Sequence, residues 1–184
     1  LDLLKNLEFV AMTEFGSDLN LRTAFVSAPL IGTLPLALAP LKQLYISETE
    51  KYAHVTYFIN GGYADSVGGE DRVLVKSPEV RSYKEAPQMA AKEITRIVLD
   101  SLKNQTHEFI CLNYPNADMV GHTGDFEKTK KGIEVIDSQL EKINELVKKK
   151  SGTLVITADH GNADILFNEE LQLPYTFHTK CEVP

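Results

Sequence analysis

The alternation of short strand-like segments with longer helical segments is the feature that most constrains the fold of this chain. Four short segments are rich in β-branched and aliphatic residues: 44–46, 72–76, 108–112 and 153–157. After the second and the third of them, apolar residues recur every three to four positions, which is the spacing of one helix face. Strands that alternate with helices in this way form a mainly parallel sheet, so we predict an α/β fold with helices flanking the sheet.

Three helices are expected between these strands. The first begins after Ser47, which stands three positions before Glu50 as in a capping box, and it ends at about Ile59, before the turn Asn60-Gly61-Gly62. The second has Pro87 in its first turn, and one side of it is apolar: Ala90, Ile94, Ile97, Val98 and Leu102. The third is long, and its apolar residues share one face: Ile133, Ile136, Leu140, Ile143 and Val147.

The region before residue 41 lacks this order. Residues 7–12 predict one short strand, and the rest of the region up to about residue 40 is expected to be irregular. Prolines at positions 29, 35 and 40 break regular structure or start helices. We interpret this stretch as a connector that contains one short helix, and we place a candidate domain boundary near residue 40.

The composition favours a soluble globular protein with one core. A chain of 184 residues is long enough for one hydrophobic core and short for two. The net charge is −7 and no basic stripe occurs, which argues against nucleic-acid binding. No apolar run approaches the roughly 18 residues of a membrane span, and no signal-peptide pattern occurs, so we predict a cytoplasmic protein with no membrane partner. Cys111 and Cys181 lack metal-type spacing and fit reduced thiols.

Polar side chains follow two of the predicted strands at their carboxyl ends, where open α/β sheets gather their ligand sites. Asp118 and His122 follow the segment 108–112, Asp159 and His160 follow 153–157, and His178 lies in a polar segment further on. Asp118 and His122 are four positions apart, so a helical turn would place both on one face. Carboxylate and imidazole ligands suit divalent ions, and two such sets could hold two metals about 3.5–4 Å apart.

Each of these residues also has a plainer explanation. An isolated Asp-x-x-x-His spacing is more often a surface pair, whereas Asp-His-Gly at a strand end is more specific because histidine is uncommon there. Lys51 would ordinarily be a solvated helix lysine, His54 fits packing or capping, and His107 fits a solvated position. From the residues alone, a two-metal site and a set of unrelated polar pairs remain alternatives.

Five longer motifs occur along the chain: ETEKYAHVTYFINGG at 48–62, GGEDRVLVKSPEVRSYKEAPQMAAKEIT at 68–95, NADMVGHTGD at 116–125, TADHGNAD at 157–164 and FHTKCEVP at 177–184. Together they resemble the cofactor-independent phosphoglycerate mutases of the alkaline phosphatase superfamily. The resemblance covers the chain from about residue 9 to residue 184. The Asp-His-Gly motif alone would indicate only the superfamily, whereas the first motif is typical of the mutase.

The resemblance implies an alkaline phosphatase-like sheet and a defined chemistry. Members of the family interconvert 3-phosphoglycerate and 2-phosphoglycerate through a phosphoserine, in glycolysis and gluconeogenesis, with two divalent metals that are usually Mn²⁺; Zn²⁺, Mg²⁺ and Co²⁺ are alternatives. By motif, Asp118, His122 and His178 correspond to the ligands of one metal, and Asp159 and His160 to part of the second set. Lys51 corresponds to the catalytic and substrate-binding lysine near the phosphoryl group.

The resemblance also implies that the chain corresponds to the C-terminal portion of such an enzyme. Residues 1–40 match the tail of the transferase domain and the hinge, with the hinge itself near residues 28–42, and residues 41–184 match the C-terminal half of the metal-binding phosphatase domain. The family's serine nucleophile, a further metal aspartate and the arginines that bind substrate have no counterpart in this sequence. The sheet is therefore expected to be incomplete on its N-terminal side and to expose an apolar edge.

These implications lead to expectations about activity and partners. We expect the chain alone to have no mutase activity, and the full-length enzyme to be a monomer that acts on a small phosphoglycerate without a nucleic-acid or membrane partner. One alternative is another member of the superfamily, such as a phosphopentomutase or a phosphatase, although the lysine motif argues against it. The other alternative is a truncated, non-catalytic module that folds and binds metal.

Overall fold

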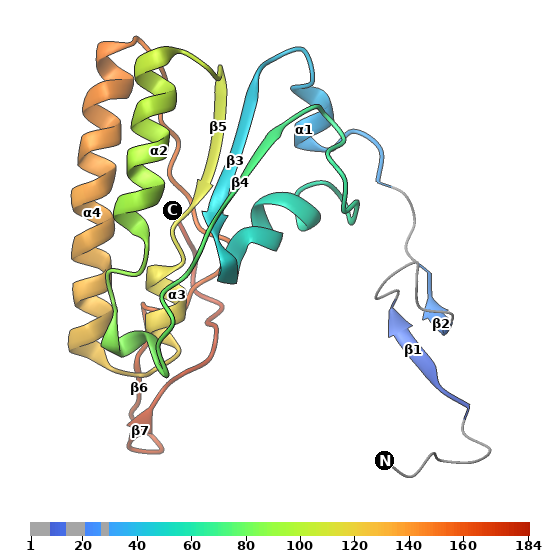
Figure 1. The fold of residues 1–184 in the computed structure, drawn as a ribbon. Coiled ribbons are helices and arrows are strands. Elements are labelled where there is room, and N and C mark those ends of the chain that lie inside the picture. Colours follow the sequence, from blue (N-terminus) through green and yellow to red (C-terminus); the bar gives the residue numbers. More distant parts are fainter. Residues whose placement is uncertain (1–7, 14–20, 27–29) are drawn as a thin grey trace. The chain divides into compact units, whose positions relative to one another are not determined.

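The computed structural model describes the chain in three stretches, residues 8–13, 21–26 and 30–184 (Figure 1). The described residues belong to two compact units, residues 1–31 and 32–184. The second unit contains the alternating strands and helices, and the first contains a pair of strands.

In the first unit, β1 (Val10–Thr13) and β2 (Arg22–Phe25) pair in parallel, with Val10 opposite Arg22. The sequence predicted a strand over residues 7–12, of which residue 7 lies outside the described residues, and an irregular chain after it. β2 corrects the second expectation. Its four residues, Arg-Thr-Ala-Phe, are too few to show the alternation of apolar and polar positions by which a strand is recognised.

The second unit is built on a three-stranded parallel sheet in the order β4-β3-β5, which confirms the predicted α/β class. The strands are β3 (Gln43–Glu48), β4 (Asp71–Val75) and β5 (Phe109–Asn113). In the central strand, Ile46 lies opposite Val73 on one side and Leu112 on the other. Every residue of β3 is buried, as is usual for a central strand of a parallel sheet that is covered on both faces.

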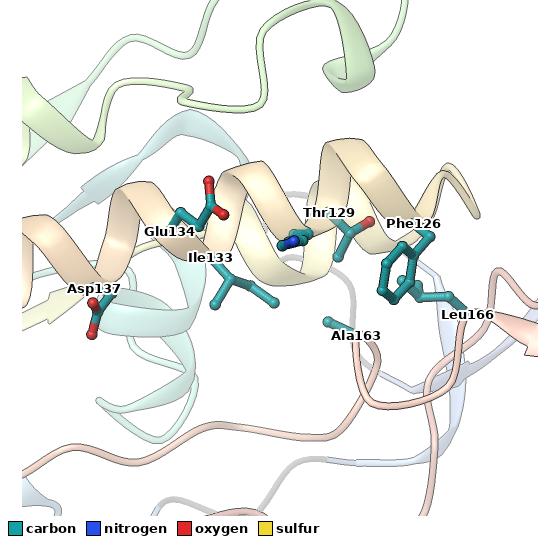
Figure 2. Close-up of a pocket in the computed structure, with 8 residues that line it drawn as sticks. Phe126, Thr129, Ile133, Glu134, Asp137, Ala163 and Leu166 are labelled. Atoms are coloured by element: carbon teal, nitrogen blue, oxygen red, sulfur yellow. The ribbon is translucent and has the colours of Figure 1, made fainter.

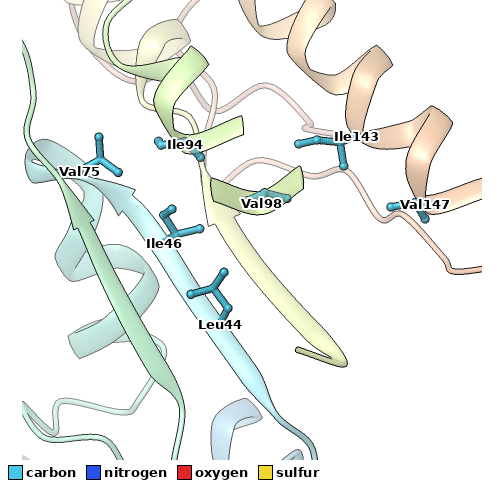
Figure 3. Packing of buried hydrophobic residues seen from close by; sticks show 7 residues of the cluster. All are labelled: Leu44, Ile46, Val75, Ile94, Val98, Ile143 and Val147. Carbon is cyan, nitrogen blue, oxygen red and sulfur yellow. The ribbon is translucent and has the colours of Figure 1, made fainter. Parts of the chain in front are cut away.

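Two long helices, α2 (Ala91–Asn104) and α4 (Phe126–Lys149), lie side by side against one face of this sheet (Figure 1). The core between helices and sheet is aliphatic, and each fully buried side chain contributes about 1.5–3 kcal/mol to folding. It consists of Leu44, Ile46, Val75, Ile94, Val98, Ile143 and Val147 (Figure 3). The predicted apolar faces are thereby confirmed in α2 and in the second half of α4, whereas Ile133, in the first half of α4, is 43% exposed.

The described residues contain no helix that is long and apolar enough to cross a membrane. The remaining regular elements are short: α1 (Leu34–Ala37), 3₁₀ turns at Thr49–Lys51 and Tyr83–Glu85, a π-helical turn at His54–Phe58, α3 (Asn116–Gly121), β6 (Phe167–Asn168) and β7 (Leu173–Pro174). β6 and β7 form an antiparallel pair near the C-terminus.

The capping box predicted at Ser47 and Glu50 is absent, which is a correction. Ser47 belongs to β3, and its Oγ donates a hydrogen bond to the carbonyl of Asn113 in β5. The strand continues to Glu48, because Glu48 still pairs with Val75 of β4. On the other side, Ser47 is the last residue that pairs with β5, opposite Asn113. The turns that follow end at Gly61 and Gly62, which have φ values of 77° and 91°, so the predicted end of this segment is confirmed.

The strand predicted over residues 153–157 is also absent. Figure 1 shows the chain after α4 as an extended trace without a strand until β6. Val155 is 80% exposed and Ile156 is 54% exposed. A strand requires a neighbour to share its backbone hydrogen bonds, and no described segment lies beside these residues as a ladder partner. The exposed aliphatic side chains therefore lie in an unpaired segment and not at an edge of the three-stranded sheet.

Candidate metal centre

Asp118 and His122 are brought together by α3, the short helix that follows β5. The backbone N–H of His122 donates to the carbonyl of Asp118 at 2.9 Å, and His122 Nε2 lies 3.1 Å from Asp118 Oδ1. The helix is anchored by Asn116, which is fully buried and donates through Nδ2 to the carbonyl of Pro87 at 2.8 Å. The spacing of four positions therefore has the consequence expected from the sequence, because both side chains project from one turn.

His178 joins this pair from the C-terminal segment. Its Nε2 lies 3.1 Å from His122 Nε2 and 3.3 Å from Asp118 Oδ1. The segment is held in place one residue later, where the N–H of Thr179 donates to the carbonyl of Gly161 at 2.8 Å. One ligand atom from each of Asp118, His122 and His178 thus lies within 4.8 Å of the others.

His122 presents a ring nitrogen to the cluster, and the three ligand atoms have the spacing that a divalent ion requires. His122 Nδ1 lies 2.8 Å from the carbonyl of Thr176, which places the proton on Nδ1 and leaves the lone pair of Nε2 directed at the cluster. Ligand atoms about 2.1 Å from one ion, at octahedral or tetrahedral angles, lie about 3.0–3.4 Å apart. The observed spacings of 3.1–3.3 Å among Asp118 Oδ1, His122 Nε2 and His178 Nε2 match this range.

Lys51 connects this trio to the second predicted pair. Its ammonium lies 2.9 Å from Asp118 Oδ2, 3.1 Å from Asp159 Oδ2 and 3.3 Å from His160 Nε2. The Lys51 side chain is only 5% exposed, so the reading of Lys51 as a solvated helix lysine is wrong. The ring of His160 stacks on that of His178 with centroids 3.7 Å apart. All six residues that the sequence singled out therefore form one cluster.

The positive charge of Lys51 sets the electrostatics of the cluster. Burial raises the pKa of the Asp118 carboxyl, but hydrogen bonds from Lys51 and Asn162 and the Lys51 charge outweigh it, so the pKa lies below its usual value. In Asp159, burial is likewise outweighed by the hydrogen bond and the charge of Lys51, and the pKa is lowered. Both carboxylates are therefore ionised and can bind cations at neutral pH.

The remaining histidines lie outside the cluster. The pKa of His54 is lowered, first by burial and then by the charge of Lys51, and its ring packs edge-on against Phe58 at 5.1 Å, in agreement with a packing role. The solvated position expected for His107 is wrong, because its side chain is 14% exposed. Its two ring nitrogens lie 2.7 Å from Ser101 Oγ and 3.0 Å from Asp71 Oδ2.

Sequence reasoning missed one residue of the site, Asn162. It is 4% exposed, and its Nδ2 donates to Asp118 Oδ1 at 2.7 Å across 44 positions of the chain. A polar residue next to the turn at Gly161 was the available signal, but nothing in a single sequence connects it to Asp118.

The pocket in Figure 2 is separate from this cluster. It has a volume of about 390 Å³ and lies between α4 and residues 163–166. Its lining is largely apolar, with Phe126, Ile133 and Leu166 facing it (Figure 2). None of the six clustered residues lines it.

Comparison with known proteins identifies relatives of this chain. The profile of the Metalloenzyme superfamily matches residues 21–184. The 2,3-bisphosphoglycerate-independent phosphoglycerate mutase of Nitrosococcus oceani is 44% identical over 182 residues, which are 98% of this chain and 35% of that protein. The protein of the same name from Legionella pneumophila (strain Lens) is 44% identical over 178 residues, which are 96% of this chain and 35% of its own length.

A solved structure gives the same result. The crystal structure of Leishmania mexicana phosphoglycerate mutase at low cobalt concentration matches with a TM-score of 0.74 and 35% identity, over 80% of this chain and 29% of that one. These matches confirm the resemblance found in the sequence motifs. The chain spans about a third of the length of the curated relatives it matches.

Proposed function

Since the chain belongs to the Metalloenzyme superfamily, we propose that it is a portion of a metal-dependent phosphoglycerate mutase. Such an enzyme interconverts 3-phosphoglycerate and 2-phosphoglycerate through a phosphoserine, in glycolysis and gluconeogenesis. The observation that carries the proposal is the convergence of Asp118, His122 and His178, whose ligand atoms lie within 4.8 Å of one another. It occurs in a chain that is 44% identical to proteins named for this activity.

The proposed role of this chain is to hold divalent metal. Asp118, His122 and His178 would hold one ion, and Asp159 and His160 would contribute to a second. We propose Mn²⁺ as the ion, with Co²⁺, Zn²⁺ and Mg²⁺ as alternatives; cobalt appears in the name of the Leishmania mexicana structure. Ions in this position act as Lewis acids that lower the pKa of a bound hydroxyl and neutralise phosphoryl oxygens.

Lys51 is proposed as the residue that binds the transferring phosphoryl group. Its ammonium is held in a fixed place by Asp118 and Asp159, so no reorganisation is needed to bring a positive charge to the carboxyl end of β3. Charge accumulates on the equatorial oxygens during phosphoryl transfer, and a preorganised ammonium stabilises it. The Nδ1–H of His122 donates to the Thr176 carbonyl, which keeps the ring in one orientation.

The rest of the machinery is proposed to lie in the part of the relatives that this chain does not span. This part comprises the serine nucleophile, the remaining metal aspartate and the arginines that bind the glycerate. Residues 1–40 are proposed as the tail of a transferase domain and its hinge, and residues 41–184 as half of the phosphatase domain. The division of the described chain into units at residue 31 lies within the proposed hinge, residues 28–42, and supports this boundary. We propose that the full-length enzyme is cytoplasmic and monomeric and acts without nucleic-acid or membrane partners.

Calorimetric titration of the purified chain with Mn²⁺ tests the metal centre. We expect one site per chain with clear affinity and a weaker second site, because one ligand set is a full trio and the other is a pair. His178→Ala should abolish the stronger site. His107→Ala, which removes a histidine outside the cluster, should leave it intact.

Two results would contradict the proposal. One is the failure of the chain to bind any of Mn²⁺, Co²⁺, Zn²⁺ or Mg²⁺. The other is an unchanged affinity in His178→Ala. A coupled assay for phosphoglycerate mutation should detect no turnover by this chain alone, since the serine nucleophile is proposed to lie elsewhere.

A further inference from the structure

We propose that Asn162 is a positioning residue that orients Asp118 for metal binding and fixes the distance between the two ligand sets. The inference rests on the proposed metal centre. Asn162 lies two positions after His160, and it makes two contacts with α3: Nδ2 donates to Asp118 Oδ1 at 2.7 Å and to the Asp118 carbonyl at 3.3 Å. The side chain therefore links the turn that carries one ligand set to the helix that carries the other.

The orientation of the Asn162 amide follows from its surroundings. Both acceptors that Nδ2 faces are oxygens of Asp118, so a flipped amide would place oxygen against oxygen. In the observed orientation, Oδ1 is buried and has no hydrogen-bond partner among the described residues. A buried amide that leaves one atom unsatisfied costs free energy, and the bond to Asp118 is what holds it there.

The two oxygens of the Asp118 carboxylate have different partners, and Asn162 contacts one of them. Oδ1 faces Asn162, His122 and His178, whereas Oδ2 faces Lys51. A hydrogen bond to a carboxylate that also ligates a metal fixes its rotation, and removing such a partner weakens metal binding about 10–100-fold. The bond from Nδ2 thus selects the oxygen that is presented to the two histidines.

Apart from the contacts of its two side chains with Lys51 and His178, the turn that carries Asp159 and His160 has few supports. The segment before it, residues 153–157, is extended and has no ladder partner among the described residues. After it, the chain is held by the bridge between Gly161 and Thr179 and by the N–H of Ile165, which donates to the Asn162 carbonyl at 3.2 Å. Among the hydrogen bonds of the described residues, those from Asn162 Nδ2 join this turn to α3 directly, whereas Lys51 joins Asp118 to Asp159 through its ammonium.

Gly121 provides the space that the Asn162 amide occupies against α3. A Cβ on residue 121 would lie 2.4 Å from Asn162 Oδ1, 3.0 Å from Cγ and 3.6 Å from Nδ2, and these three atoms are its nearest neighbours. The amide therefore packs directly on the glycine, and alanine at this position would force it away from Asp118. In the absence of the amide, the three atoms nearest to this Cβ are gone, and alanine favours the helix over glycine.

The test combines metal affinity with stability measured without metal, both on the full 184-residue chain. Asn162→Leu keeps a side chain that branches at Cγ and replaces the amide atoms by two larger methyl groups, which removes the donor, and we expect it to weaken Mn²⁺ binding about 10–100-fold. Asn104→Ala, at the exposed end of α2, is the matched control and should bind Mn²⁺ as the wild type does. Unchanged affinity in Asn162→Leu would overturn the inference while leaving the proposed metal centre in place.

The melting temperature of the metal-free chain tests the contact itself. Gly121→Ala should lower the melting temperature when Asn162 is present, and should leave it unchanged or raise it when residue 162 is alanine. The same loss in both backgrounds would overturn the inference. If the wild-type chain binds no Mn²⁺, the proposed function fails. The effect of Gly121→Ala on the melting temperature, compared between the two backgrounds, still decides whether Asn162 and Gly121 form the contact that holds Asp118.

Discussion

The ammonium of Lys51 lies 2.9 Å from Asp118 Oδ2, in a site where the lysine side chain is 5% exposed and the aspartate side chain 13% exposed. The same ammonium contacts Asp159, which is on the other ligand set. Two carboxylates from separate parts of the chain thus share one internal cation, which balances only one of their two negative charges. A divalent ion held by the trio would bind Asp118 through Oδ1, so metal and lysine would share the negative charge of one carboxylate.

Replacing Lys51 should destabilise the metal-free chain and increase its response to metal. Lys51→Met leaves two partly buried carboxylates unpaired, and we expect the free energy of unfolding to fall by about 3 kcal/mol, the lower end for a broken buried ion pair because Asp159 is 37% exposed. Added Mn²⁺ should then raise the melting temperature more than it does in the wild type. Thermal denaturation with EDTA and with Mn²⁺ measures both effects.

Lys131 provides the control for this experiment. It pairs with Glu134 on the exposed face of α4, where both side chains are more than half exposed. Lys131→Met should change stability by less than about 0.5 kcal/mol. A similarly small loss in Lys51→Met would show that the buried cluster does not depend on its lysine.

A buried glutamate should make stability fall as the pH rises through neutrality. Glu48 is fully buried, its Oε1 accepts a hydrogen bond from the N–H of Ala90 at 2.8 Å, and its Oε2 has no partner among the described residues. Burial raises the pKa of Glu48 from 4.5 to about 7. The folded chain therefore binds a proton more tightly than the unfolded chain, and the stabilisation present below pH 4.5 is lost as the pH approaches and passes 7.

The size of this effect follows from the shift. A rise from 4.5 to about 7 corresponds to about 3 kcal/mol between pH 4.5 and pH 8. Glu48→Gln cannot ionise, so its urea midpoint should depend less steeply on pH than that of the wild type. Glu79→Gln, which alters an exposed carboxylate, should keep the wild-type slope. Parallel slopes in wild type and Glu48→Gln would mean that Glu48 is ionised in the folded chain.

Glu70 should have the opposite dependence on pH. Burial raises its pKa, but hydrogen bonds from Asn60 and Arg72, with others from its own backbone N–H and from Ser66, outweigh burial and hold the pKa at about 2. Its stabilisation is present above pH 4.5 and is lost as the pH falls toward 2. We expect Glu70→Gln to lower stability at pH 7 by about 2 kcal/mol and to flatten the acid limb of the denaturation profile. An unchanged acid limb would contradict the ion-pair geometry with Arg72.

The part of the fold that could be predicted from the sequence is the part that repeats a local pattern. Ile94 and Val98 share a helix face, and the apolar runs of β3 and β5 are visible as runs, so the strands, the long helices and the α/β class followed from spacing. Asp118 and His122 could be paired in the same way because four residues make one helical turn. These inferences need no knowledge of what lies across the core.

The rest depended on contacts between distant residues. Ser47 has the spacing of a cap, yet it belongs to a strand because Asn113 and Leu74 lie beside it. Residues 153–157 have strand composition but lack a neighbour, and Lys51 looks like a surface lysine until Asp118 and Asp159 converge on it. Asn162 acts across 44 positions. Tertiary packing decided each of these cases, and a local pattern carries no information about it.

Two β-branched aliphatic residues, one in the sheet and one in the unpaired segment, should differ sharply in their contribution to stability. Ile46 is fully buried at the centre of β3, and Ile46→Ala should lower the free energy of unfolding by about 2–5 kcal/mol through lost burial and the cavity left behind. Val155 is 80% exposed, and Val155→Ala should cost less than about 0.5 kcal/mol. Chemical denaturation of both variants measures the contrast. A loss above about 1 kcal/mol in Val155→Ala would show that residues 153–157 are packed as a strand in solution, contrary to the extended, exposed conformation described above.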